Sequence, residues 1–303
     1  SNLKFLTLGE LTMQLIAWVS MVYLGLTFGL SFSIVKIILR EIESPIVILF
    51  WQSCFSSVLL FAFSVYSLNS LKDIVNNIAA LTLLACFGVI IPNFILYLSA
   101  SHLSAGTISI LLALIPFCAY LIALILRIEQ LDLVRLFGVI LGFAAILFLV
   151  FPGNANNKTY FNIWFLTGLL VPIFIASTNI FLSNVRFKKV KPLHIAFGMN
   201  FLSATLLSLM LPSHVNVWLS SHSTKLIFYI FLLSFIGSIG FIIFIKLVKN
   251  HGPVFASQVN YLITISGIMW GYIILSEVHS MRFWVSLLLI IGGLFLVRPI
   301  KIK

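Results

Sequence analysis

Long apolar runs alternate with short polar or charged segments along the whole chain. A helix needs about 20 predominantly apolar residues to cross the hydrocarbon core of a bilayer. The stretch 78–126 is too long for one crossing, so we divide it at the polar residues 101–104. The pattern then predicts ten membrane-spanning helices, over residues 12–36, 46–66, 78–98, 104–126, 133–151, 163–184, 193–212, 226–247, 253–275 and 281–298.

The chain also contains an internal repeat. Residues 102–152 and 251–299 share one order: a His, a short polar segment, an apolar run that ends in Glu, and a second apolar run that ends in Pro. Each half, 1–152 and 153–303, holds five predicted spans, and an odd number of crossings inverts the second copy. We therefore expect an all-α integral membrane protein of two inverted five-helix repeats, with a substrate site near the midplane between them.

Composition supports the membrane assignment. The 303 residues are 61% hydrophobic and only 8% charged, whereas soluble domains carry about 25% charged residues. The net charge of +11 could indicate nucleic-acid binding, but cytoplasmic loops of membrane proteins are enriched in Lys and Arg. With the N-terminus inside, most of the 18 basic residues fall in inner segments, above all the RFKKVK run at 186–191. We expect both termini in the cytoplasm and no nucleic-acid partner.

Several motifs resemble the ten-span EamA type of the drug/metabolite transporter superfamily. They are YLGLTFGLSFSIVKIIL around Lys36, LSAG at 103–106, Pro116, Glu129 and Gly138, and, in the second half, a basic loop after the sixth span and YIILSE ending at Glu277. The resemblance implies a carrier of small metabolites in a bacterial inner membrane, often an exporter of amino acids or their derivatives. Two positions depart from the family pattern: Trp51-Gln52 replaces an Arg, and Thr264 replaces a Pro.

No acidic residue lies at membrane depth. All seven Asp and Glu residues fall at span ends or in loops. Small multidrug members of the superfamily couple protons through a carboxylate about two turns before a Lys in the first span. Here Phe28 stands eight residues before Lys36, and a phenyl ring cannot titrate. We therefore expect a carrier driven by substrate gradients and not by protons.

Polar residues inside the spans are candidates for substrate binding, because such groups are costly in lipid. Amides and phenols can hold a polar solute by hydrogen bonds without a buried charge. Aromatic rings could cover an apolar or cationic part of the solute. The alternative is that amides join helices and aromatic rings pack or lie at the interface. The candidates are Asn93, Tyr97, Asn179, Gln258, Asn260, Tyr261, Phe32, Trp18 and Trp270.

Other residues receive a positional or structural role. Lys36 ends the first span, at the mouth of the pathway or extended to the interface. We expect Glu129 and Glu277 to cap a turn or to pair with nearby Arg135 and Arg282. A bend is expected at Pro116. Close helix packing is expected at Gly25, Gly29, Gly138 and Gly142.

The sequence contains no phosphate-binding GxxxxGK loop, no metal-ligand spacing and no nucleophile constellation. We therefore expect no cofactor and no enzyme activity. The leading hypothesis is an exporter of an amino acid or derivative; a vitamin, nucleoside or drug-like cation is the alternative cargo. A membrane-embedded lipid-modifying enzyme is the alternative of another class. The expected partners are the small-molecule substrate and the lipid bilayer, and a homodimer is left open.

Overall fold

The computed structural model describes residues 8–42, 44–64, 75–127, 130–150, 163–182, 190–211, 224–251, 256 and 258–296. These residues form helices joined by short turns, and no strand occurs among them. The helices are α1 (Leu8–Leu39), α2 (Pro45–Ser64), α4 (Ile78–Ala85), η1 (Cys86–Ile90), α5 (Ile91–Ala100), α6 (Ala105–Leu112), α7 (Ile115–Ile125), α8 (Leu133–Val150), α9 (Ile163–Gly168), α10 (Leu170–Leu182), α12 (Pro192–Ser208), α14 (Thr224–His251), α16 (Val259–Leu275) and α17 (Met281–Leu296).

Each predicted span corresponds to one helical segment of the bundle. The third is built from α4, η1 and α5, the fourth from α6 and α7, and the sixth from α9 and α10. Within the described ranges, six segments are long and apolar enough to cross a membrane, and α8, α16 and α17 supply shorter apolar helices. The prediction of an all-α membrane protein is confirmed. Glu129 lies outside the described residues.

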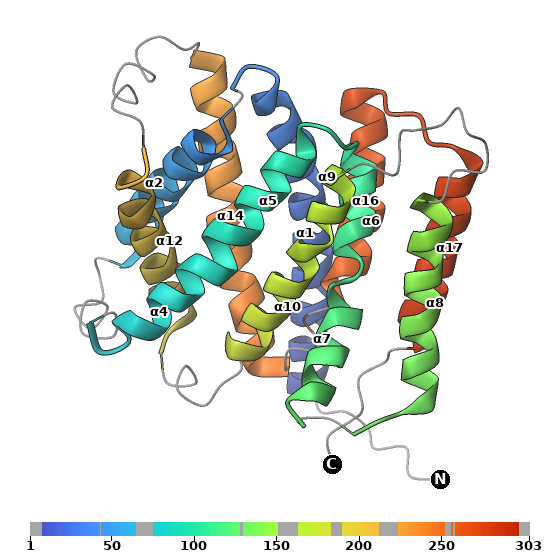
Figure 1. Cartoon of the computed structure of the whole chain (residues 1–303). Helices are drawn as coiled ribbons and strands as arrows, with labels where there is room; N and C mark the ends of the chain where they lie inside the picture. Colours follow the sequence, from blue (N-terminus) through green and yellow to red (C-terminus); the bar gives the residue numbers. More distant parts are fainter. Residues whose placement is uncertain are drawn as a thin grey trace.

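The two halves are related by inversion. In Figure 1, α1 rises through the bundle whereas its repeat counterpart α9–α10 descends, and α8 and α17 also run in opposite directions. Packing follows the same symmetry, because α1 packs on α16 as α10 packs on α7, and α2 packs on α14 as α12 packs on α4. The counterparts α2 and α12 pack on each other, as do α8 and α17. The arrangement is the one expected of inverted repeats.

The small residues of α1 form a seam between the halves. The Ser266 hydroxyl on α16 donates to the Gly25 carbonyl at 2.5 Å. A Cβ atom added at Gly29 would lie 2.1 Å from Ser266 Oγ and 2.7 Å from the backbone nitrogen of Gly267. The backbones of α1 and α16 approach this closely only because these side chains are absent or small.

A second seam joins α8 to α17. A Cβ atom added at Gly293 would lie 2.7 Å from the Gly138 carbonyl oxygen. One added at Gly142 would lie 2.5 Å from the Phe117 ring of α7. The glycines predicted to allow close packing therefore do so within one chain.

Two of the predicted spans contain an irregular segment next to a proline. Pro116 stands at the start of α7, directly after the turn at Ala113 and Leu114 that ends α6. Pro92 follows η1, a short π-helix in which the Ile91 amide bonds to Cys86, five residues earlier. Because proline has no N–H, each of these two prolines removes one backbone hydrogen bond from its helix. Such irregular backbone is tolerated at membrane depth where it borders protein or a cavity.

Candidate functional site

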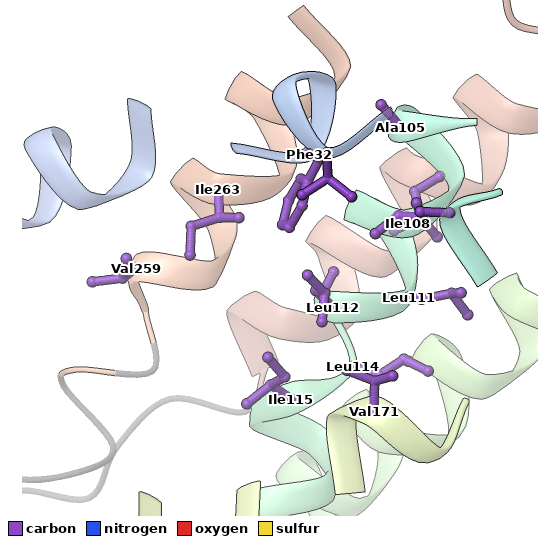
Figure 2. Packing of buried hydrophobic residues seen from close by; sticks show 14 of the residues in the cluster. Phe32, Ala105, Ile108, Leu111, Leu112, Leu114, Ile115, Val171, Val259 and Ile263 are labelled. Atoms are coloured by element: carbon purple, nitrogen blue, oxygen red, sulfur yellow. The ribbon is translucent and has the colours of Figure 1, made fainter. Parts of the chain in front are cut away.

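A cavity of about 240 Å³ lies between the two halves. Its described lining comes from α1, α2, η1, α5, α6 and α7 of the first half and from α10, α12, α14 and α16 of the second. Figure 2 shows part of its apolar wall, with Phe32 of α1, Leu112 and Ile115 on either side of the helix break, and Ile263 of α16. The volume is slightly below the roughly 300–1,000 Å³ of sites for drug-sized ligands, so the space suits a small metabolite.

The cavity brings together five of the nine residues predicted to bind substrate. Four of the five are polar, and the fifth is an aromatic ring of α1. They come from four of the predicted spans, two in each half. The five are Asn93, Tyr97, Asn179, Asn260 and Phe32.

The other four predicted residues do not line this cavity. Asn260 and Ile263 of α16 are three apart and both line it, whereas Tyr261 and the N-cap residue Gln258 do not. Trp18 is 54% exposed on the outside of α1. The remaining one, Trp270, donates its indole N–H to the Leu26 carbonyl at 3.1 Å.

Sequence reasoning overlooked several lining residues. Gln52 was noted only because it stands where the family often has an Arg, and Asn200 was not considered. Both are polar residues inside apolar runs, which is the signal that should have identified them. The further lining residues that were missed include Phe28, Ser31, Ser56, Thr178, Phe241 and Phe244.

The polar lining is ordered by hydrogen bonds. The Tyr97 hydroxyl donates to Gln52 Oε1 at 2.5 Å, which ties α5 to α2. The amide of Asn93 donates to the Val89 carbonyl at 2.8 Å, and that of Asn200 donates to Ala196 at 2.9 Å. These bonds fix the side chains before any ligand arrives, and such pre-organisation lowers the cost of binding.

The described lining contains no acidic or basic side chain. Phe28, the residue eight positions before Lys36, lies in the wall of the cavity. Its ring fills a notch over Gly240 of α14, where an added Cβ atom would lie 2.5 Å from it. An apolar ring therefore occupies the place at which a coupling carboxylate would be sought.

Charged residues gather instead at one end of the bundle, in a group that we call the Lys36–Glu277 cluster. The Glu277 carboxylate accepts hydrogen bonds from the amides of Ala105 and Gly106, at 2.8 and 3.1 Å. The Lys36 ammonium donates to the Leu103 carbonyl at 2.6 Å and lies 3.6 Å from Glu277 Oε1. A carboxylate is favoured here, because the first amides of α6 carry partial positive charge.

The role predicted for Glu277 needs correction. We expected it to cap its own turn or to pair with Arg282, yet it binds the N-terminus of α6 in the other half. The chain reverses at Ser276, whose φ of 54° is left-handed, and the Glu277 amide bonds back to Gly271. This reversal directs the carboxylate toward α6, and local sequence does not reveal a partner so far away.

His279 completes the cluster. Its ring stacks on Phe283 with centroids 3.9 Å apart, and its Nε2 lies 3.9 Å from Glu277 Oε2. A Cβ atom added at Gly106 would lie 2.6 Å from this ring, so the residue after Ala105 must be small. Burial lowers the pKa of His279, and the neighbouring Glu277 partly offsets that effect.

A family model matches the chain twice, over residues 15–151 and 162–298, and its description is "EamA-like transporter family". The chain belongs to this family. It is therefore a membrane transporter of the drug/metabolite type. One solved structure, described only as "Crystal structure of protein", is similar to this EamA-like chain with a TM-score of 0.59 and 15% identity, over 92% of this chain and 97% of that one. No curated protein matches the sequence.

The family assignment agrees with the chemistry of the site. Among the described residues, no group of three or more His, Cys, Asp or Glu side chains could hold a metal ion. The cavity instead offers amides, hydroxyls and phenyl rings from both repeats. Such an arrangement can bind and release a solute, which is what a transporter requires.

Proposed function

We propose that this EamA-like protein is a secondary carrier that moves a small organic metabolite across a bacterial inner membrane by alternating access. The observation that carries the proposal is the central cavity lined by both inverted halves. Carriers of this plan bind the solute at the interface of the repeats and expose it to each side in turn. Amino acids or their derivatives are the favoured cargo, and export is the favoured direction.

The Lys36–Glu277 cluster supplies a candidate for the gate at one end. Val35 lines the cavity, and the next residue, Lys36, belongs to the cluster. Glu277 comes from the second half, whereas its partners Lys36, Ala105 and Gly106 come from the first. Separating the halves at this end must break those contacts. With both termini in the cytoplasm, this end faces outward.

We infer that transport is driven by the substrate gradient. Phe28 in the cavity wall cannot exchange a proton, and the described lining residues include no carboxylate. Amides and hydroxyls carry no charge and do not exchange protons for transport. The concentration gradient of the substrate itself is then the driving force. An imposed pH gradient should therefore leave the rate of uptake unchanged.

Counterflow in liposomes tests the proposal. Purified protein is reconstituted with a mixture of unlabelled amino acids and amines inside, and each labelled compound is offered outside in turn. Saturable, transient accumulation of one compound is the expected result. A linear flux that never saturates would indicate a channel and would contradict the proposal, and strict dependence on a pH gradient would contradict the driving force.

Two variants connect the flux to the cavity. Asn200→Leu removes a polar group from the lining and should lower counterflow at subsaturating substrate. Thr205→Val changes an exposed polar residue on the same helix, α12, and should leave it unchanged. Equal effects of the two variants would mean that the cavity is not the transport site.

A further inference from the structure

The hydroxyl groups that line the cavity already donate hydrogen bonds to other groups of the protein. Ser31 donates to the Phe28 carbonyl at 2.5 Å, and Thr178 donates to Phe174 at 2.9 Å. The Tyr97 hydroxyl donates to Gln52 at 2.5 Å. Each hydroxyl has one hydrogen and two lone pairs. In this arrangement these lining groups can offer a ligand only acceptor lone pairs.

The amides and the broken helix add further acceptors. Asn93 and Asn200 each use one N–H on the preceding turn of their own helix, so each keeps one N–H donor and an acceptor oxygen. Pro116 has no N–H to give the carbonyl of Leu112, four residues earlier and part of the lining. Gln52 also keeps its amide N–H groups, so the amides supply donors as well as acceptors, whereas the hydroxyls supply acceptors alone.

The phenyl rings in the lining also favour a cation. Phe28, Phe32, Phe241 and Phe244 line the cavity together with the polar groups, and the faces of phenyl rings attract cations. No basic side chain occurs among the described lining residues to repel one. Lys36, which follows the lining residue Val35, is held by Leu103 and Glu277 at the end of the bundle.

We propose that the cavity recognises a protonated amine, and that it holds the substrate by its ammonium group and not by a carboxylate. The inference rests on the proposed transport function and narrows its substrate class. Ammonium N–H groups donate to the Ser31, Thr178, Tyr97 and Asn oxygens, and the organic part of the amine packs against the phenyl rings. An anion would meet amide N–H groups but no basic side chain among the described lining residues, and the phenyl faces favour a cation over an anion, so amines derived from amino acids fit better than the acids themselves.

Binding of four matched probes to purified protein tests the proposal. The probes are 2-phenylethylamine, the neutral 2-phenylethanol, the anionic 3-phenylpropionate, and N,N,N-trimethyl-2-phenylethylammonium, which keeps the charge but has no N–H. Calorimetry at pH 7 should give an affinity for the amine at least ten-fold above those for the alcohol and the acid. The trimethylated cation should fall between the amine and the alcohol.

The other outcomes count against the proposal. Equal or tighter binding of 3-phenylpropionate or of the alcohol would overturn it, as would the absence of binding by all four probes at millimolar concentration. Equal binding of the amine and its trimethylated analogue would also overturn it, because the acceptor oxygens would then have no role.

Two paired variants test whether the amine binds in the cavity. Thr178→Val removes one lining hydroxyl and should weaken binding of 2-phenylethylamine about five-fold, as for the loss of one hydrogen bond. Thr205→Val removes a hydroxyl with the same 2.9 Å bond to the preceding turn, but on the exposed surface, and should change nothing. A loss of affinity in both variants, or in neither, contradicts the assignment.

A transport assay distinguishes a failure of this inference from a failure of the proposed function. Should the amine bind with the expected selectivity but show no counterflow in liposomes, the binding chemistry would stand and the carrier proposal would fail. Should 3-phenylpropionate be exchanged as readily as the amine, the carrier proposal would stand and the ammonium preference would fail.

Discussion

The cavity and the Lys36–Glu277 cluster are neighbours on α1 but use opposite chemistry. Val35 borders the cavity and Lys36 belongs to the cluster. The described cavity lining relies on amides, hydroxyls and rings, whereas the cluster joins an ammonium, a carboxylate and two backbone amides. A full charge is costly at membrane depth unless it is paired. Among the described residues, the charges of this cluster therefore lie where a helix end neutralises the carboxylate, and neutral dipoles line the cavity.

If the comparison holds, variants of the cluster should act on stability and gating, and variants of the cavity should act on affinity. The largest effect is expected for Glu277→Ala, which strips Lys36 and the amides of Ala105 and Gly106 of their partner. Leaving partly buried amides and a partly buried ammonium without their partner costs about 1–3 kcal/mol. Thermal unfolding in detergent should show a clearly lower midpoint.

A control at the same end of the bundle sharpens this prediction. Glu41→Ala changes an exposed acid just beyond α1 and should leave the unfolding midpoint within about 1 °C, because exposed charges contribute little. Equal midpoints for the two variants would show that the cluster is not a structural link between the halves.

The next largest effect is expected for Gly29→Ala, in the seam between α1 and α16. The added Cβ would lie 2.1 Å from Ser266 Oγ, and overpacking of this kind costs about 1–3 kcal/mol. Gly292→Ala on α17 meets only a Leu141 methyl at 4.0 Å and serves as the control. Denaturant or thermal unfolding of the two proteins distinguishes them. A Gly29→Ala protein as stable as the Gly292→Ala protein would contradict the close seam.

A smaller effect, and one on affinity, is expected for Tyr97→Phe. This change removes the bond to Gln52 and returns the Gln52 oxygen to the cavity without altering the ring. The loss of one hydrogen bond corresponds to about 1 kcal/mol. Substrate affinity from a binding titration should change several-fold. A shift of the unfolding midpoint as large as that of Glu277→Ala would contradict the distinction between cavity residues that set affinity and cluster residues that set stability.

The smallest expected effect is a pH dependence of stability through His279. Burial lowers the pKa of His279 in the folded protein, so the unfolded chain takes up the proton first as the pH falls. The stability contributed by neutral His279 is present above its unfolded pKa of about 6.5 and is lost below it. Unfolding midpoints between pH 7.5 and 5.5 should fall less steeply for His279→Gln than for the natural protein. Parallel slopes would rule out this contribution.

The architecture followed from the sequence, but the composition of the site followed only in part. Asn93, Tyr97, Asn179 and Asn260 were selected as polar residues in apolar runs, and all four line the cavity. The same rule selected Gln258 and Tyr261, which do not. A one-residue step turns a helix side chain by about 100°, so polarity alone cannot say which side of α16 meets the cavity.

The sequence by itself determined the helical segments, the two repeats and their inversion, because bilayer thickness fixes the length of an apolar run and an odd number of crossings reverses the second copy. Only the tertiary structure decided the rotation of each helix and the distant partners. Gln52 meets Tyr97, and Glu277 meets Ala105 across 172 positions of sequence. Those pairings depend on how the helices of the bundle pack together, and no single helix encodes that packing.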